Sequence, residues 1–174
     1  MKRAVFLDRD GVLNRSMIRN GRPCAPTSAK EFELLTGVPE AVARLRKAGF
    51  LLIVVTNQPD IAAGTVSREV LERIHEKLRA LLPIDDIKVC CHADKDECAC
   101  RKPKPGMLLE AAREWSIDLN RSFIVGDRWR DISAGKAAGC KTIFVDYGYA
   151  ERLTDPPDFV VTSLQEAASI ILPQ

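Results

Sequence analysis

The segment FLDRDGVLN, residues 6–14, stands where an apolar strand ends and the chain turns. Asp8 and Asp10 lie two residues apart at the end of an apolar run that begins at Ala4, and Gly11 permits a sharp change of direction. Ligands of an open parallel sheet bind at the carboxyl ends of its strands. Two carboxylates this close repel each other unless they share a proton or a cation. The segment alone therefore fits a metal or phosphate site and an ordinary Asp-Gly turn about equally well.

Length and composition limit the class of protein. The chain has 174 residues, 46% of them hydrophobic and 29% charged, which predicts a single domain over residues 1–174 with a substantial core. A net charge of +2, with no basic stretch interleaved with aromatic residues, argues against a nucleic-acid partner. No apolar run approaches the roughly 20 residues of a membrane span, and the N-terminus shows no signal-peptide core. We therefore expect a cytoplasmic protein, without a membrane partner, whose six cysteines are reduced.

Apolar strands alternate with amphipathic helices along the chain. The expected strands are 3–8, 50–55, 87–91, 122–125 and 141–145, with a sixth short strand at 159–161. The expected helices are 39–47, 67–81, 107–115, 131–138 and 163–172. This alternation predicts an α/β fold, a three-layer Rossmann-like parallel sheet of five to six strands with helices on both faces. Residues 15–33 are polar and predict an irregular excursion over the active edge, and no interval leaves room for a separate cap domain.

Further polar residues follow the later strands. Thr56 and Asn57 end the second strand, Lys102 precedes the helix after the third, and Asp127 ends the fourth with Asp131 four residues on. Each alone has an ordinary explanation as a strand end, a solvated lysine, a turn or a helix N-terminal charge. Together they would meet the two carboxylates of the first turn. Carboxylates that bind Mg²⁺, a hydroxyl group and a lysine form a set suited to phosphoryl transfer.

Four segments of the chain resemble the motifs of the haloacid dehalogenase-like phosphatases: FLDRDGVLN, VVTNQ, RKPKPGM and VGDRWRDI. The first motif and CRKPKPGM further resemble the D-glycero-D-manno-heptose 1,7-bisphosphate phosphatases, to which the histidinol-phosphate phosphatases are close. The resemblance spans about residues 3–170. It implies a Mg²⁺-dependent phosphomonoesterase that acts on a sugar phosphate or bisphosphate, foremost at the 7-phosphate of the heptose bisphosphate, through an aspartyl-phosphate intermediate.

The resemblance also implies roles for individual side chains. Asp8 matches the family's nucleophile, Asp10 its general acid/base, and Lys102 the lysine that stabilises the transferring phosphoryl group. Thr56 and Asn57 match the phosphate-binding second motif. Three groups match the Mg²⁺ ligands of the family: the side chains of Asp8 and Asp127 and the main-chain carbonyl of Asp10. Asp131 matches an acid that supports the metal site, and Arg101 matches a position that contacts substrate.

A second candidate metal site lies in the loop before Arg101. Cys90, His92, Cys98 and Cys100 form a C-x-H, C-x-C pattern, which offers the Cys₃His ligand set of a structural zinc site. Buried reduced cysteines are the alternative interpretation, and it is the one we favour for the interleaved Cys91. The heptose and histidinol-phosphate phosphatases carry a similar loop. We expect a structural Zn²⁺ that pins the loop ahead of the active-site lysine, with no open position for catalysis.

The substrate is less strongly indicated than the chemistry. Eight basic residues near the expected mouth suit a substrate with more than one anionic group, namely Arg9, Arg15, Arg19, Arg22, Arg101, Lys104, Arg128 and Arg130. The loop Pro59–Thr65 departs from the heptose-phosphatase pattern, since it lacks a basic and an aromatic residue and gains an acid.

Three functions remain open after the sequence alone. They are a heptose bisphosphate phosphatase, a phosphatase of histidinol phosphate or another small phosphorylated metabolite, and a zinc-stabilised binding module without catalysis. A small capless domain of this kind is expected to be a monomer. His75, in the second expected helix, is interpreted as a surface or half-buried residue.

Overall fold

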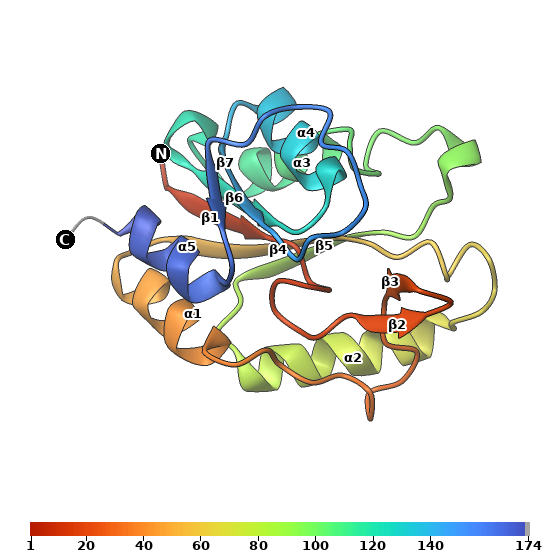
Figure 1. Ribbon diagram of the computed structural model, residues 1–174. Helices are drawn as coiled ribbons and strands as arrows, with labels where there is room; N and C mark the ends of the chain where they lie inside the picture. The colour runs from red at the N-terminus through yellow and green to blue at the C-terminus, as the bar shows by residue number, and fades with distance from the viewer. Residues whose placement is uncertain (173–174) are drawn as a thin grey trace.

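The fold, seen in a computed structural model that describes residues 1–172 apart from the side chain of Arg22, is built on one parallel sheet (Figure 1). Residues 173 and 174 of the expected domain lie outside the described residues. Six strands follow the order β5-β4-β1-β6-β7-β8, all of them parallel. Their bounds are β1 (Ala4–Leu7), β4 (Leu51–Asn57), β5 (Asp86–Cys90), β6 (Phe123–Gly126), β7 (Lys141–Val145) and β8 (Phe159–Val161). The expected sixth strand is confirmed.

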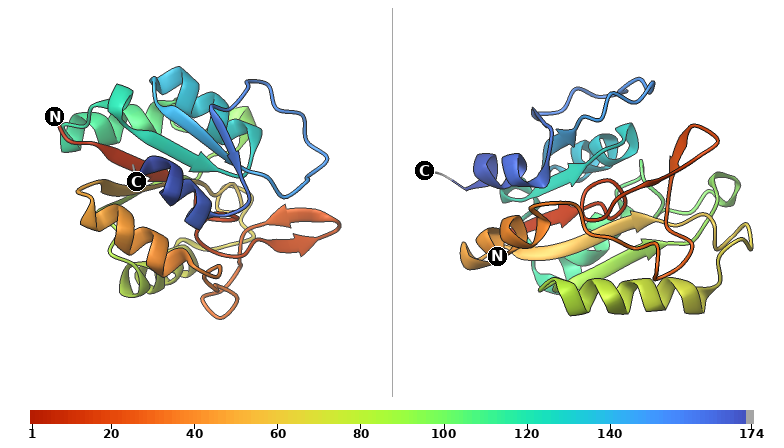
Figure 2. Two further views of the ribbon diagram at one scale, coloured as in Figure 1. Left: turned by 60° about the vertical axis from the view of Figure 1, so that its left-hand side comes forward. Right: turned by 60° about the horizontal axis from the view of Figure 1, so that its bottom comes forward.

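Helices cover both faces of the sheet, so the expected three layers are confirmed (Figures 1 and 2). One face packs against α1 (Val38–Lys47), α2 (Arg68–Leu81) and α5 (Leu164–Ile171), and the other against α3 (Gly106–Trp115) and α4 (Trp129–Ala138). Alternate residues of β1 divide between the two cores, Val5 on the first face and Phe6 on the second. Burial on both faces explains why the central strands are continuously apolar.

The ends of the helices follow from local chemistry. Ser67 caps α2, because its hydroxyl oxygen accepts a hydrogen bond from the Val70 amide at 3.2 Å. Ser163 caps α5 in the same way, through the amide of Glu166. Gly139 ends α4 in the left-handed region at φ 85°. The starts of α2 and α5 lie within one residue of the expected starts at 67 and 163, and the end of α4 agrees with the expected end at 138. Among the described residues, no helix is long and apolar enough to cross a lipid bilayer.

The segment 15–33 departs from the expected irregular excursion. It contains a two-stranded antiparallel hairpin, β2 (Met17–Arg19) and β3 (Arg22–Cys24), which stands beside the carboxyl ends of the main sheet (Figure 2). Its turn is Asn20-Gly21, with φ 52° and 72°. Two positive φ values are what a two-residue hairpin turn needs, and Asn-Gly is the preferred pair for it. Within residues 1–172 the chain inserts this hairpin and no cap domain between its strands.

Candidate active site

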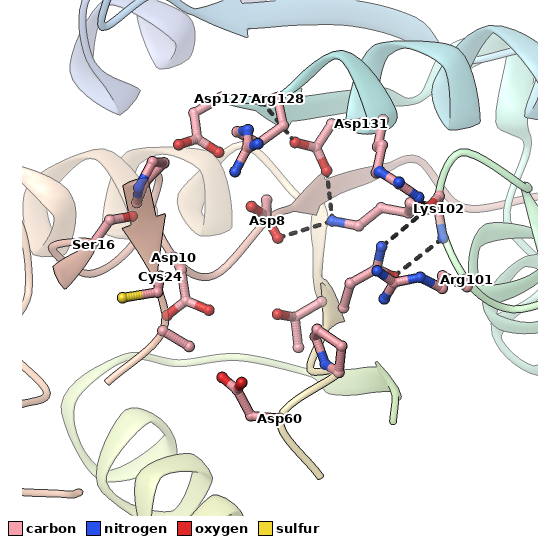
Figure 3. Close-up of a pocket in the computed structure, with 16 residues that line it drawn as sticks. Asp8, Asp10, Ser16, Cys24, Asp60, Arg101, Lys102, Asp127, Arg128 and Asp131 are labelled. Carbon is pink, nitrogen blue, oxygen red and sulfur yellow. Dashed lines mark hydrogen bonds and ion pairs between the residues drawn. The ribbon is translucent and has the colours of Figure 1, made fainter. Parts of the chain in front are cut away.

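A cavity of about 370 Å³ opens at the carboxyl edge of the sheet (Figure 3). All eight residues predicted for phosphate, Mg²⁺ or substrate contribute to its lining: Asp8, Asp10, Thr56, Asn57, Arg101, Lys102, Asp127 and Asp131. They come from the ends of β1, β4 and β6, from the start of α4, and from the loop before α3. The parallel topology thus brings together side chains that are as much as 123 positions apart in the sequence, from 8 to 131.

The turn after β1 fixes the first carboxylate at the edge of the sheet. The Asp8 amide donates to the carbonyl of Val125 in the neighbouring strand at 3.0 Å. Gly11 follows at φ 92°, and a Cβ atom there would lie 2.1 Å from Asp127 Oδ2. Only glycine fits this position, for reasons of both backbone angle and space. The close approach places the Asp8 turn directly against the acid at the end of β6.

Lys102 is the buried cation of the site. Its Nζ donates to Asp8 Oδ1 at 2.8 Å, to the Val55 carbonyl at 2.7 Å and to Asp131 Oδ1 at 2.5 Å, so all three of its protons have acceptors (Figure 3). Burial alone would lower the pKa of this amine, but the charges of Asp131 and Asp8 outweigh burial and raise the pKa. Lys102 is therefore a permanent positive charge beside Asp8.

Three buried acids, Asp8, Asp127 and Asp131, each place an oxygen within 4.8 Å of the others; we call them the acid site. Burial, and then the charge of Asp131, raises the pKa of Asp8 to about 7. Burial and the charge of Asp8 raise the pKa of Asp127 well above its ordinary value. One lysine thus does not neutralise the acid site, and a further cation would lower the free energy of the charged carboxylates.

The hydrogen bonds divide the acid site into two kinds of acid. Asp131 has both oxygens in use, since Oδ1 accepts from Lys102 and Oδ2 from the Arg128 amide at 3.1 Å. The buried Oδ1 of Asp127 has no hydrogen-bond partner among the described residues. A buried oxygen of this kind beside a second carboxylate fits a hard divalent cation such as Mg²⁺. The roles of Asp127 and Asp8 as ligands and of Asp131 as a supporting acid stay predictions, with which this arrangement is consistent.

The second motif contributes a hydroxyl and an amide with different surroundings. The buried Thr56 lines the cavity, and its Oγ1 accepts from Gln58 Nε2 at 2.9 Å. The Asn57 amide pairs with the backbone of Lys102 in both directions, donating to its carbonyl at 3.0 Å and accepting from its N–H at 3.1 Å. Asn57 thus joins β4 to the loop that carries the lysine, a structural contact that the sequence did not indicate.

Asp10 is held by neighbours that sequence reasoning missed. Its carboxylate accepts from Asn14 Nδ2 at 2.9 Å, from Gln58 Nε2 at 2.8 Å, and from the guanidinium of Arg9, with Nη2 at 3.0 Å from Oδ2. Arg9 is fully buried and also contacts His75 Nε2 at 3.1 Å. Two interpretations from sequence are therefore wrong. Arg9 is turned inward instead of toward substrate, and His75 is buried with 2% of its surface exposed.

Other basic residues do face the cavity. Arg101, Arg128 and Arg130 line it, whereas Arg19 pairs with Glu31 on the hairpin side. Arg101 and Arg130 share the carboxylate of Asp94, at 2.8 and 2.9 Å. The side chain of Arg22, also expected at the mouth, lies outside the described part of the chain. The remaining candidates at the mouth, Arg15 and Lys104, are not part of the lining.

The four predicted zinc ligands gather in one loop; we call them the cysteine cluster. Their sulfur and Nδ1 atoms lie within 4.8 Å of one another. Cys98 Sγ is 3.7 Å from Cys90 Sγ and 3.5 Å from Cys100 Sγ, and His92 Nδ1 is 3.3 Å from Cys100 Sγ. A tetrahedral site with Zn–S bonds of about 2.3 Å needs ligand atoms about 3.8 Å apart. The cluster therefore has ligands of the type and spacing that Zn²⁺ requires.

The thiols of the cluster differ in protonation: burial raises the pKa of Cys90 and of Cys100, whereas the pKa of Cys98 is lowered. Burial acts to raise the pKa of Cys98, but hydrogen bonds from the Arg101 amide and the neighbouring thiols outweigh it and lower the pKa to about 7. A thiolate is the form that binds a metal. Cys91 lies outside the cluster, as expected, and all six cysteines are free thiols.

Comparison with known proteins places this geometry in a family. A family model described as "HAD-hyrolase-like" matches residues 99–167. The D-glycero-beta-D-manno-heptose-1,7-bisphosphate 7-phosphatase of Pasteurella multocida (strain Pm70) is 41% identical, and the match covers 98% of this chain and 97% of that protein. The corresponding protein of Photorhabdus laumondii subsp. laumondii is 40% identical over 97% of this chain and 89% of its own length.

Solved structures agree with the sequence comparison. The D,D-heptose 1.7-bisphosphate phosphatase from B. bronchiseptica, complexed with magnesium and phosphate, has 34% sequence identity and a TM-score of 0.83, and the match covers 98% of each chain. The corresponding phosphatase from Burkholderia Thailandensis has 29% identity and a TM-score of 0.71, with 99% of this chain and 100% of that chain covered. The chain therefore belongs to the haloacid dehalogenase-like hydrolases, in the family of the D-glycero-beta-D-manno-heptose-1,7-bisphosphate 7-phosphatases.

Proposed function

We propose that this chain is a Mg²⁺-dependent phosphomonoesterase that hydrolyses D-glycero-β-D-manno-heptose 1,7-bisphosphate at its 7-phosphate, with Asp8 as the nucleophile. The observation that carries the proposal is the 2.8 Å contact between Lys102 Nζ and Asp8 Oδ1, beside the Oδ1 of Asp127, which has no hydrogen-bond partner in the described part of the chain. It supports the proposal because the carboxylate that would attack, a fixed cation and the acid that would bind the metal lie together in the cavity. The family relationship supports the choice of substrate.

Mg²⁺ fits the acid site by the chemistry of its donors. The residues that would hold it are Asp8 and Asp127 through their side chains and Asp10 through its main-chain carbonyl, with Asp131 in support. When bound there, Mg²⁺ would neutralise phosphoryl oxygens and favour the carboxylate forms of the acids. Every other contribution to catalysis comes from side chains of the chain itself.

In the first step, an oxygen of the Asp8 carboxylate attacks phosphorus, and the bond from phosphorus to the sugar oxygen breaks. Asp8 is held for this attack because Lys102 and the backbone of β6 fix it from two sides. The Lys102 ammonium also offsets negative charge on the phosphoryl oxygens. The Thr56 hydroxyl, which lines the same cavity, can donate to one of those oxygens, because its described contact uses it only as an acceptor.

Asp10 supplies and recovers the proton. As a carboxylic acid it gives its proton to the leaving sugar oxygen while the P–O bond breaks. As a carboxylate it then takes a proton from the water that attacks the phosphoaspartyl group, and inorganic phosphate and free Asp8 result. The Asp10 side chain lines the cavity with 15% of its surface exposed, so it can reach both the leaving oxygen and water.

The cavity has basic side chains that would bind a second phosphate. Arg101, Arg128 and Arg130 line it, and guanidinium groups bind phosphate through paired N–H donors. Arg101 keeps the role of substrate contact, together with Asn57 at the phosphate end. Pro59 and Asp60 of the atypical loop also line the cavity, so this loop is in a position to contact substrate. Asp60 would repel a nearby anionic group of the substrate, so it would affect substrate specificity more than the chemical step.

A structural Zn²⁺ in the cysteine cluster completes the proposal. The cluster uses all four of its ligands, so a catalytic role for this metal is not proposed. Cys100 is followed directly by Arg101 and Lys102, and the amide of Arg101 hydrogen-bonds within the cluster. Zinc binding would therefore hold the backbone that delivers both cations. We further propose that the chain is a single domain that acts as a monomer in the cytoplasm, where the thiols stay reduced.

A substrate panel tests the function. With Mg²⁺ present, we expect phosphate release from the heptose 1,7-bisphosphate to exceed release from other sugar phosphates and from histidinol phosphate by at least about 10-fold in kcat/KM, since a site built for two phosphates loses binding energy with one. Preference for histidinol phosphate, or for another metabolite, would replace the proposed substrate. No release from any member of a broad phosphomonoester panel would favour a non-catalytic binding module.

A further inference from the structure

The α2 helix reaches the active site through a chain of buried polar contacts. His75 lies in the second turn of α2 with 2% of its surface exposed, and its Nε2 is 3.1 Å from Arg9 Nη1. Arg9, fully buried, directs Nε and Nη2 to the carboxylate of Asp10 at 3.0 to 3.2 Å. The connection therefore runs from α2 through one guanidinium to the proposed acid/base, although His75 and Asp10 are 65 positions apart.

The chemistry of the two side chains fixes the state of His75. A guanidinium has donors and no acceptor, so Nε2 must accept the hydrogen bond and the ring proton must lie on Nδ1. Burial, and then the charge of Arg9, lowers the pKa of His75 to about 4, which agrees with a neutral ring. The neutral ring is the acceptor that keeps Arg9 Nη1 satisfied in the core.

The contact matters because Arg9 has no other described partner for Nη1. Its Nε and Nη2 form a fork on Asp10, and the planar guanidinium turns as one body. A change at Nη1 thus rotates the fork on the carboxylate. Asn14 and Gln58 hold the same two oxygens, but each by a single bond. A fork held at its far end gives Asp10 one orientation, and proton transfer needs its oxygen within hydrogen-bond reach of the leaving atom.

We propose that His75 is a positioning residue for this reaction, which acts through Arg9 to hold the Asp10 carboxyl group in line for proton transfer to the leaving oxygen. The inference rests on the proposed function. His75 is neither part of the cavity lining nor of the acid site, so it differs from the proposed catalytic residues in what its loss should change. Loss of His75 should affect the proton that goes to the leaving group and leave the attack by Asp8 intact.

Leaving groups of different basicity test this distinction. A sugar alkoxide needs a proton to leave, whereas nitrophenolate leaves without one. For H75L, which lacks an acceptor, we expect kcat/KM for the sugar bisphosphate to fall about 10-fold, mostly through kcat, while kcat/KM for p-nitrophenyl phosphate changes less than about twofold. For H75Q, whose amide oxygen can accept from Arg9, both values should stay within about threefold of the unsubstituted protein.

Two further variants set the scale. D10N should show the same dependence on leaving group with a larger loss, about 10²-fold or more for the sugar bisphosphate. L78A removes a fully buried apolar side chain, which cannot hydrogen-bond to Arg9, from the same helix about one turn on, and should lower thermal stability. Any loss of activity in L78A should be the same for the two substrates. Should H75L fail to fold, H75N takes its place, because it keeps a polar group with a side chain too short for Nη1.

Each outcome decides the inference. An equal loss on both substrates in H75L, or the selective loss in L78A as well, would make His75 a structural residue only. Unchanged kcat/KM on the sugar bisphosphate would remove any role in the reaction. If the unsubstituted protein hydrolyses neither substrate, the proposed function fails instead, and this result is separate from all of those for His75.

Discussion

The acid site and the cysteine cluster are both arranged to hold a metal, but the chain builds them in opposite ways. The acid site takes Asp8 from β1 and Asp127 and Asp131 from the end of β6 and the start of α4. The cysteine cluster takes four ligands from residues 90–100. The first exists only when the sheet has formed, whereas the second lies within one continuous segment, from the last residue of β5 into the loop that follows it. The acid site therefore depends on topology, and the cysteine cluster on spacing.

The two sites also differ in how they handle charge. The acid site already has a buried lysine as a counter-charge, and the carboxylates that surround this lysine are themselves buried and repel one another. The cysteine cluster contains no lysine or arginine among its ligands, so thiolates there depend on a metal for their counter-charge. Substitutions in the acid site should thus distinguish loss of catalysis from loss of folding stability. Substitutions in the cysteine cluster should show whether an ordered loop is needed for catalysis.

The largest effect should come from D8N. It removes the proposed nucleophile but keeps the size of the side chain, so phosphate release should fall by about 10³-fold or more. The fold should persist, because the change also relieves repulsion among buried acids. Phosphate release and circular dichroism measure the two expectations.

A matched control is D60N, an aspartate that lines the same cavity outside the acid site. Its kcat should stay within about threefold of the unsubstituted protein, and any effect of the substitution should be on KM. Full activity in D8N would refute Asp8 as nucleophile, and loss of the fold would show that the acid site is needed for structure.

K102Q should affect both chemistry and stability. It leaves Asp8 and Asp131 buried without their cation, and breaking a buried ion pair from one side costs about 3–5 kcal/mol. We expect a loss of this order in the free energy of unfolding, measured by denaturant titration without Mg²⁺, together with a fall in kcat. Added Mg²⁺ should recover part of the stability, since it binds the folded state.

K104Q provides the comparison for this effect. Lys104 lies two residues on, and its Nζ donates to the carbonyl of Glu97 at the surface. Its loss should change stability by less than about 0.5 kcal/mol. If K102Q and K104Q were equally stable, the buried lysine would not be what holds the acid site together.

Features that depend on local sequence could be predicted, whereas features that depend on packing between distant segments could not. Apolar runs and their alternation with amphipathic segments predicted the strands and helices, because burial on both faces of a sheet and on one face of a helix leaves periodic signals. The residues at the strand ends could be grouped because parallel strands end at one edge. The inward turn of Arg9 toward His75 could not be predicted, since it depends on the packing of α2 against the first turn. The hairpin was predictable in principle, because Asn20-Gly21 is its turn signal.

C98S tests the cysteine cluster. We expect the purified protein to lose its zinc by elemental analysis and kcat/KM to fall by about 10- to 100-fold, because a displaced Arg101 and Lys102 no longer meet the substrate and Asp8 in register. The melting temperature should change little even though activity falls, since the loop packs at one edge of the core.

C91S is the matched control for this substitution. Cys91 lies within the same segment but outside the cluster, so zinc content and kcat/KM should both be retained. If C98S kept its zinc, or if C91S lost it, the ligand set would be wrong. Zinc-free C98S with full activity would separate the cluster from the delivery of Lys102.

The smallest effect is a pH dependence of stability contributed by His75. Burial and the charge of Arg9 lower its pKa to about 4, against 6.5 in the unfolded chain. As pH falls below 6.5, the unfolded state takes up a proton that the folded state refuses, so stability is present above pH 6.5 and is lost toward pH 4. Between pH 7 and 5.5 the loss should be about 1 kcal/mol, measured by urea titration of metal-free protein.

H75Q isolates this contribution, because the amide does not titrate. Asp8 titrates in the same range with the opposite sign, since a raised carboxyl pKa makes the folded state the better proton acceptor and adds stability as pH falls toward the unfolded pKa. Asp8 is present in both proteins, so the difference between their pH profiles belongs to His75. We expect the unsubstituted protein to lose about 1 kcal/mol more than H75Q over this interval. Parallel profiles would mean that His75 accepts a proton in the folded state as readily as in the unfolded one, which a ring buried against Arg9 should not do.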